Sequence, residues 1–101
     1  MPDANPEGGV TTVEVTGPVT RAEVIRWCGA FSEGLARGRG LRLDLAASGP
    51  WDLAGVQLLL ATIASGKRAG RPIFLARVPN VLKAIAERAE LKSRLAAITE
   101  D

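Results

Sequence analysis

Three short segments with the pattern of β-strands, each followed by a helical pattern, constrain the fold of this chain most strongly. In residues 10–16, Val13 and Val15 alternate with polar residues, as on a strand with one buried face. Residues 41–45 alternate strictly, and residues 72–76 are apolar with a proline at their start. This order of strands and helices predicts an α/β domain with a largely parallel sheet and right-handed crossovers.

The first strand is expected to stop at Gly17-Pro18, and the first helix to begin at Thr20–Glu23, which has the form of a capping box. Its apolar positions recur at helical spacing before a glycine-rich stop at residues 38–40; they are Val24, Cys28, Phe31 and Leu35. Cys28 is thus expected to be a buried thiol. Trp27 is expected at the edge of the core.

The second helix follows a turn-like segment, residues 46–51, and Asp52 is placed to cap it. Its predicted apolar stripe consists of Leu53, Val56, Leu59, Leu60 and Ile63. Lys67 and Arg68 suit its carboxyl end, and Gly70 suits the left-handed position that follows. A last helix is expected to use Val81, Leu82, Ile85, Leu91 and Leu95, with a break near Ala89.

At least two of the strands have a polar side. Arg42 and Asp44 point away from the buried side of their strand, as do the polar residues of the first strand. We therefore expect a small, mostly parallel or mixed sheet with helices packed mainly on one face and the other face comparatively open.

Length and composition predict one domain. The chain has 101 residues, 47% of them hydrophobic and 24% charged, as in an ordinary globular protein. We expect a flexible N-terminus over residues 1–9, a single domain over 10–98 and a short C-terminal end over 99–101. The start lacks the pattern of a secretory signal, and the longest apolar block is far shorter than the ~20 residues of a membrane span. A cytoplasmic location without membrane insertion is expected.

The chain has no histidine and one cysteine. It therefore lacks the commonest general base, the commonest metal ligand and the usual partner of a nucleophilic serine or cysteine. The glycines at 38 and 40 precede a strand, which is the wrong order for a phosphate-cradling turn. We expect no enzyme activity, no catalytic or metal-binding residues and no cofactor.

The most specific stretch runs from Asp44, at the end of the Leu-Asp-Leu strand, to Gly55 in the first turn of the second helix. It resembles the STAS domain, the fold of bacterial anti-sigma factor antagonists, in which a strand ending in Leu-Asp-Leu leads to Asp-Ser-Ser-Gly-Leu at a helix start. Asp44 and Asp52 have the separation of the two aspartates of that family. Ala69–Pro72 and Val81-Leu82 also look like STAS, so the resemblance covers roughly residues 13–95.

The resemblance implies an STAS-like fold and a role in signal transduction or transcription regulation. In the family, the domain docks on a kinase or other regulator, and phosphorylation of the residue before the glycine controls release. Here that residue is Ala54 and the one before it is Leu53, and neither can accept a phosphate. The implied function is a non-catalytic docking domain, binding an anti-sigma kinase-like or other regulator through residues 44–56 without that switch.

The candidate partner-binding residues lie in this loop, at the helix start and in a neighbouring turn; they are Asp44, Ser48, Trp51, Asp52, Leu53, Ala54, Gly55 and Asn80. Several also have a purely structural interpretation. Asp52 could serve only as a helix cap, worth about 0.5–2 kcal/mol, and Asp44 could be simply solvated. Trp51 is either tucked beneath the loop or exposed as a binding anchor. Gly55 in a helix indicates a close backbone approach or packing demand.

Two other functions stay open from sequence. Nucleic-acid binding is suggested by a pI near 9.2 and by a set of cations, Arg37, Arg39, Arg42, Lys67, Arg68 and Arg71, although the net charge is only +2. An accessory subunit of a chemosensory or transport complex is the other alternative, since STAS-like domains serve in both. The chain could also form a homodimer.

Overall fold

A computed structural model describes residues 9–89 of the chain. The elements are β1 (Val10–Glu14), β2 (Gly17–Val19), α1 (Val24–Arg37), β3 (Gly40–Asp44), β4 (Ser48–Trp51), α2 (Leu53–Ala69), β5 (Ile73–Ala76) and α3 (Asn80–Arg88). The predicted positions Leu91 and Leu95 of the last helix lie outside the described residues.

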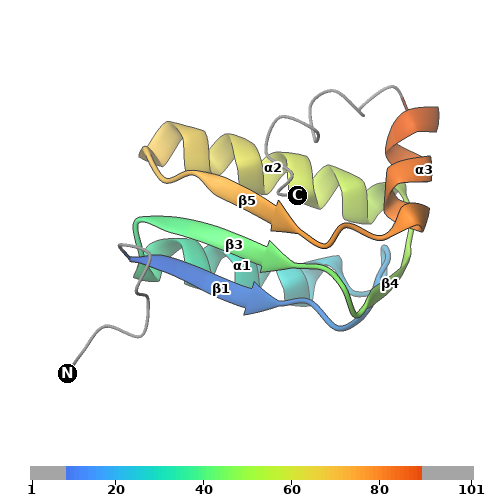
Figure 1. Cartoon of the computed structure of the whole chain (residues 1–101), viewed down its shortest axis with the longest axis horizontal. Coiled ribbons are helices and arrows are strands. Elements are labelled where there is room, and N and C mark those ends of the chain that lie inside the picture. The colour runs from blue at the N-terminus through green and yellow to red at the C-terminus, as the bar shows by residue number, and fades with distance from the viewer. Residues whose placement is uncertain (1–8, 90–101) are drawn as a thin grey trace.

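The main sheet has three parallel strands in the order β1-β3-β5. Its central register aligns Val13, Leu43 and Leu75 across the three strands. Helices α1 and α2 lie behind one face of this sheet, and α3 lies beyond the carboxyl ends of the strands (Figure 1). The predicted α/β architecture, with helices mainly on one face, is confirmed.

The core lies between the sheet and these two helices. Leu41, Leu43 and Leu45 are fully buried, as their alternation predicts, and they pack with Phe31 of α1 and Leu59 of α2. Gly34 allows α1 to approach the sheet closely, because a Cβ there would stand 2.9 Å from the Leu41 side chain.

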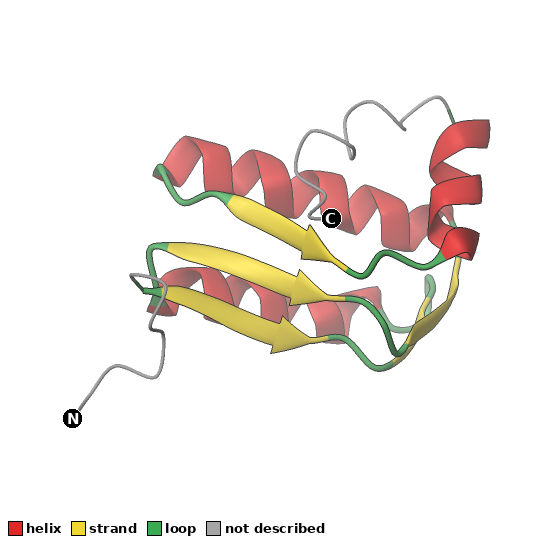
Figure 2. Cartoon of the chain, viewed as in Figure 1, coloured by secondary structure: helices red, strands yellow, loops and turns green. Residues whose placement is uncertain are grey.

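A second, two-stranded parallel sheet pairs β2 with β4, and the sequence did not predict it (Figure 2). Both strands contain a Gly-Pro pair, which we interpreted as a strand end at residues 17–18 and as a turn at 46–51. In fact Gly17, with a φ of 76°, redirects the chain, and its N–H donates to the Ala47 carbonyl at 3.0 Å. The chain therefore continues as short strands beyond the main sheet.

Two details of α1 differ from the prediction. The helix begins at Val24 rather than at Thr20, although the Glu23 carboxylate accepts the Thr20 N–H at 3.1 Å, which is half of the predicted capping box. Cys28 is exposed, so the prediction of a buried thiol was wrong. The buried face is rotated by about one residue and includes Trp27, whose indole N–H donates to the Pro18 carbonyl at 3.2 Å.

Helix α2 begins and ends where predicted, with Asp52 as its cap and Gly70 in the left-handed conformation. Of the predicted stripe, Val56 and Leu59 are fully buried, and Leu60 and Ile63 are partly buried against the core. The buried face also includes Gly55, Thr62 and Gly66, which the prediction lacked. Leu53 is 49% exposed instead of buried. In residues 9–89, no helix combines the length and the apolar character needed to cross a membrane.

Candidate functional site

The predicted docking loop lies at the end of the molecule where the main strands finish. It leaves β3, forms β4 and enters α2, and α3 packs beside both β4 and α2. Figure 1 shows this end, with α3 standing next to the start of α2. The loop is thus held between two helices and a small sheet.

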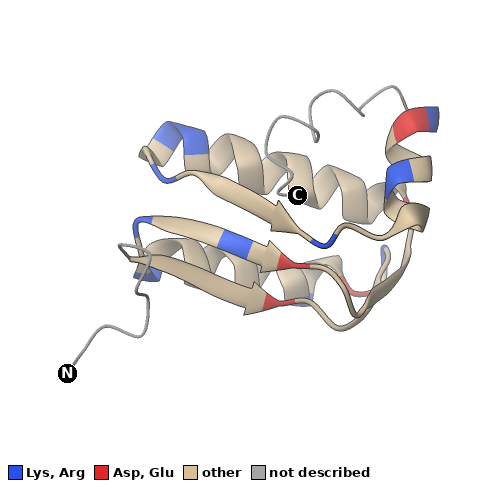
Figure 3. Cartoon of the chain, viewed as in Figure 1, with Lys and Arg blue, Asp and Glu red and all other residues tan. Residues whose placement is uncertain are grey.

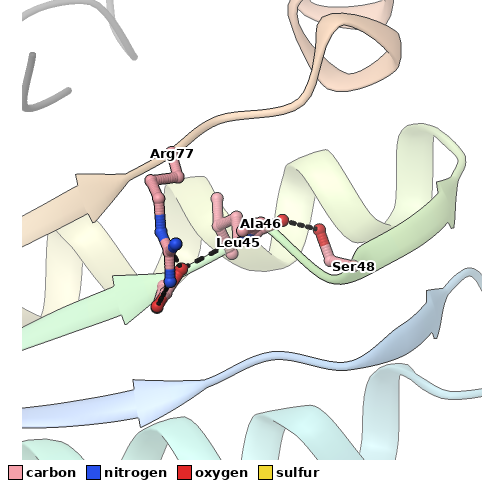
Figure 4. Close-up of polar contacts among 5 residues, drawn as sticks. Leu45, Ala46, Ser48 and Arg77 are labelled. Atoms are coloured by element: carbon pink, nitrogen blue, oxygen red, sulfur yellow. Dashed lines mark hydrogen bonds and ion pairs between the residues drawn. The ribbon is translucent and has the colours of Figure 1, made fainter.

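Asp44, at the end of β3, is not simply solvated. Its carboxylate accepts the Arg77 Nε–H at 3.1 Å, a second contact from Arg77 Nη2, and the Ala46 N–H at 3.2 Å (Figure 4). Arg77 has a φ of 55°, an uncommon conformation for a residue with a side chain. These contacts, the hydrogen bond from Arg77 first, lower the pKa of Asp44. Asp44 therefore ties the ends of β3 and β5 together.

Ser48 and Trp51 form a small network beneath the loop. The Ser48 hydroxyl donates to the Leu45 carbonyl at 2.7 Å and accepts the Trp51 indole N–H at 2.8 Å (Figure 4 shows the former). Trp51 is only 5% exposed. Of the two interpretations of Trp51, the tucked one is therefore correct, and the ring supports the loop from inside.

Asp52 caps α2 and also binds the segment that leads into α1. One carboxylate oxygen accepts the Gly55 N–H at 3.1 Å, and the other accepts the Arg21 N–H at 3.0 Å. These donors, Arg21 first, lower the pKa of Asp52 below its ordinary value of 3.8. The aspartate thus holds the starts of the two long helices together.

Replacing Asp52 with asparagine should reduce the stability of the domain in a pH-dependent way. A carboxyl group whose pKa is lowered on folding contributes stability above its unfolded pKa, and this contribution is lost as the pH falls through the folded pKa. Asparagine caps about as well but does not titrate. We expect the difference in free energy of unfolding between wild type and Asp52→Asn to be largest above about pH 4 and to shrink at lower pH. Urea denaturation across pH measures it, and a constant difference would contradict this role.

Gly55 lies where backbone and aromatic ring leave no room for a side chain. A Cβ at this position would stand 2.2 Å from the Val19 carbonyl oxygen and 2.7 Å from Cε3 of Trp51. The close approach expected from the sequence is therefore present, and it comes from β2 and from the tryptophan.

The exposed part of the region is a shallow groove between the start of α2 and the last turn of α3. It measures about 490 Å³ and is lined by Trp51, Asp52, Leu53, Ile85, Arg88 and Ala89. Sequence reasoning missed the α3 residues as part of this site, although Ile85 was predicted as apolar. Asn80 is exposed at the other end of α3 and does not line the groove.

Of the predicted site residues, the groove brings together Trp51, Asp52 and Leu53 only. Both aspartates accept several N–H groups and so hold neighbouring segments in place. Among residues 9–89, no three acidic, cysteine or histidine side chains gather as a metal-binding group. What the arrangement offers is a shallow, largely apolar surface above a hydrogen-bonded loop.

Several solved structures share this fold, including the following three. A sulfate transporter family protein from Wolinella succinogenes superposes with a TM-score of 0.75 at 19% identity, covering 96% of this chain and 80% of that one. The SulP transporter STAS domain from Vibrio cholerae gives 0.67 at 15% identity, covering 95% and 75%. The murine anion transporter Slc26a9, in the inward-facing state, gives 0.67 at 21% identity, covering 79% of this chain but 14% of the transporter.

Sequence comparison identifies the family. No curated protein is significantly similar to this chain in sequence. The sequence model of the STAS_2 family, described as "Mlab, STAS domain", matches residues 4–98, which is nearly the whole chain. The loop from Asp44 to Gly55 resembles STAS domains, and the sequence match extends this likeness over nearly the whole chain. This chain therefore belongs to that STAS-domain family.

Proposed function

We propose that this chain is a non-catalytic regulatory domain that binds a protein partner through the start of α2 and the adjacent groove. The proposed docking face consists of Leu53, Ala54, Ile85 and Arg88. The partner is an anti-sigma kinase-like protein or another regulator. The function rests on the family and on the exposed apolar residue that this face presents.

The observation that carries the proposal is the exposure of Leu53. A leucine that is 49% exposed in the first turn of a helix contributes little to the core, but it can fill a pocket on a partner. It lies beside a groove whose other wall contains Ile85 and whose rim carries Arg88. An apolar centre with a charged rim is the usual composition of a protein interface.

Control by phosphorylation at the position before Gly55 is chemically impossible in this chain, because Ala54 has no hydroxyl group. The surface around it is already fixed by the cap at Asp52 and by the buried ring of Trp51. We therefore propose that this domain is always competent to bind and that any regulation acts on the partner.

Replacing Ala54 with glutamate should abolish partner binding while leaving the domain folded. A negative charge in the first turn of a helix is favourable by about 0.3–1 kcal/mol, so unfolding is not the expected cause of any loss. The matched control is Ser32→Glu, which adds the same charge at an exposed position of α1 outside the groove.

The measurement is quantitative affinity capture from a lysate of the native host with three baits. We expect at least one protein to be retained by wild type and Ser32→Glu and to be reduced tenfold or more with Ala54→Glu, since a buried unpaired charge costs several kcal/mol. Equal recovery of every protein with all three baits would refute docking at this face.

A subunit of a membrane transporter is the second candidate partner, because the solved structures of similar fold include STAS domains of transporters. The same capture distinguishes the candidates through the identity of the retained protein. A kinase or sigma regulator supports the first candidate, and a transporter component supports the second.

A further inference from the structure

Five basic residues that the proposed docking face does not use gather at the opposite end of the molecule. They are Arg37 at the end of α1, Arg39 before β3, Lys67 and Arg68 in the last turn of α2, and Arg71 before β5. We call this set the basic pole. Figure 3 shows these cations at the end where the main strands begin, whereas most acidic residues lie toward the other end.

The segments that carry the basic pole are bonded to each other. The Arg71 guanidinium donates to the Leu35 carbonyl in the last turn of α1 at 2.9 Å, and the Arg71 N–H donates to the Gly66 carbonyl of α2 at 2.7 Å. Arg71 thereby joins the carboxyl ends of both helices. All the other members of the pole are exposed to solvent.

Positive charge at this end exceeds what the fold requires. Cations in the last turns of α1 and α2 offset the helix dipoles, which accounts for Arg37, Lys67 and Arg68. Arg39 lies outside any helix and gains nothing from a dipole. Within residues 9–89, the ion pair recorded at this end joins Arg37 to Glu33 at 3.7 Å, between largely exposed side chains. The remaining positive charge faces solvent.

The composition of the pole indicates which kind of anionic partner it fits. Helix carboxyl ends present carbonyl oxygens, so the backbone here cannot cradle a single phosphate. None of the exposed large hydrophobic residues found among the described residues, Ile25, Leu53 and Val81, lies at this end, so the pole lacks the apolar centre of a protein interface. It also has no aromatic residue on which nucleotide bases could stack.

The kind of partner that remains is an extended anionic surface, because excess positive charge alone is enough to attract it. We propose that the basic pole binds reversibly to the surface of a membrane that contains anionic lipids. Helix α2 has 17 residues and so spans about 25 Å from Leu53 to the pole. The domain could therefore lie with its pole on the bilayer while the opposite end stays open to a partner. This inference is independent of the proposed function.

The experiment is co-sedimentation of the full chain with vesicles of neutral phosphatidylcholine, with or without about 30 mol% phosphatidylglycerol. Each Lys or Arg near an anionic surface contributes about fivefold in affinity, so the double variant Lys67→Gln/Arg68→Gln should bind about 25-fold more weakly. Binding of the wild type should require the anionic lipid and should fall as salt rises from about 50 to 200 mM.

The matched control is Arg26→Gln/Lys83→Gln, which removes the same net charge from exposed positions away from the pole. This variant should keep its affinity within about twofold, while thermal denaturation shows that both variants are folded. Failure of the wild type to bind anionic vesicles at low salt would overturn the proposal, as would an equal loss in the two variants.

A DNA duplex and a single strand of equal length, tested under the same salt, form the second arm. Tighter binding to either nucleic acid than to the vesicles, with the same loss in the pole variant, would overturn the proposal and assign the pole to nucleic acid instead. If the chain binds both nucleic acids more weakly than the anionic vesicles, and the vesicle result is as expected, a membrane surface is supported as the partner.

Discussion

Replacing Trp51 with alanine should lower the free energy of unfolding by about 3–5 kcal/mol, the range for removing a large buried aromatic side chain. Trp51 is 5% exposed, lies against Gly55, and donates its indole N–H to Ser48 at 2.8 Å. The variant would lose this packing and leave a cavity beneath the start of α2. Urea denaturation monitored by circular dichroism measures the effect, and a loss below about 1 kcal/mol would show that the ring does not support the loop.

Trp51→Phe is the companion variant in case the alanine variant does not fold. It retains an aromatic ring but removes the hydrogen bond to Ser48, so we expect a loss of roughly 1–2 kcal/mol. Ser48→Ala should cost a comparable amount, because it leaves the indole N–H without its partner. The two single losses should not add in the double variant, since both remove the same hydrogen bond.

The proposed docking face is supported by hydrogen bonds, because residues of the predicted site serve the fold. Asp44 is bound to Arg77, Ser48 to Trp51, and Asp52 to the N–H groups of Arg21 and Gly55. These contacts leave Leu53 and its groove as the exposed part. A preorganised surface loses little conformational entropy on binding, which favours a partner that docks without rearranging the domain.

The main features of the fold were predictable from sequence where one local pattern has one structural consequence. The alternation at residues 41–45 requires a strand with a single buried face, and its three leucines are fully buried. Asp52 before an apolar run and Gly70 after it define the ends of α2, as their caps confirm. In these cases side-chain chemistry and backbone conformation agree.

Sequence reasoning failed where pairing or exposure depends on distant residues. A Gly-Pro pair predicts a turn, yet residues 17–19 and 48–51 form strands because each supplies the other with a partner. The groove needs α3 to lie beside α2, and no local pattern fixes where α3 lies. Leu53 fits an apolar stripe by spacing, but the face of α2 that is buried is the one with Gly55, Val56 and Leu59, so the Leu53 side chain stays 49% exposed.

Gly55→Ala should lower the free energy of unfolding by about 2–3 kcal/mol, although alanine favours a helix over glycine by about 1 kcal/mol. The added Cβ would stand 2.2 Å from the Val19 carbonyl oxygen, which is backbone and cannot rotate away. Relief would require β2 or Trp51 to move. Because each kcal/mol changes Tm by about 4–8 °C in a domain of this size, thermal denaturation should show a clear decrease.

The control for Gly55→Ala is Gly29→Ala, a change of the same atoms in α1. A Cβ at Gly29 would meet nothing within 4 Å, so only the helical preference for alanine acts and we expect a gain of about 0.5–1 kcal/mol. Opposite signs for one substitution in two helices would isolate the close approach as the cause of the Gly55 effect. If both variants were stabilised, the Val19 carbonyl oxygen would lie farther from an added Cβ than the 2.2 Å given by the structure. Close packing against β2 would then not be the reason for a glycine at position 55.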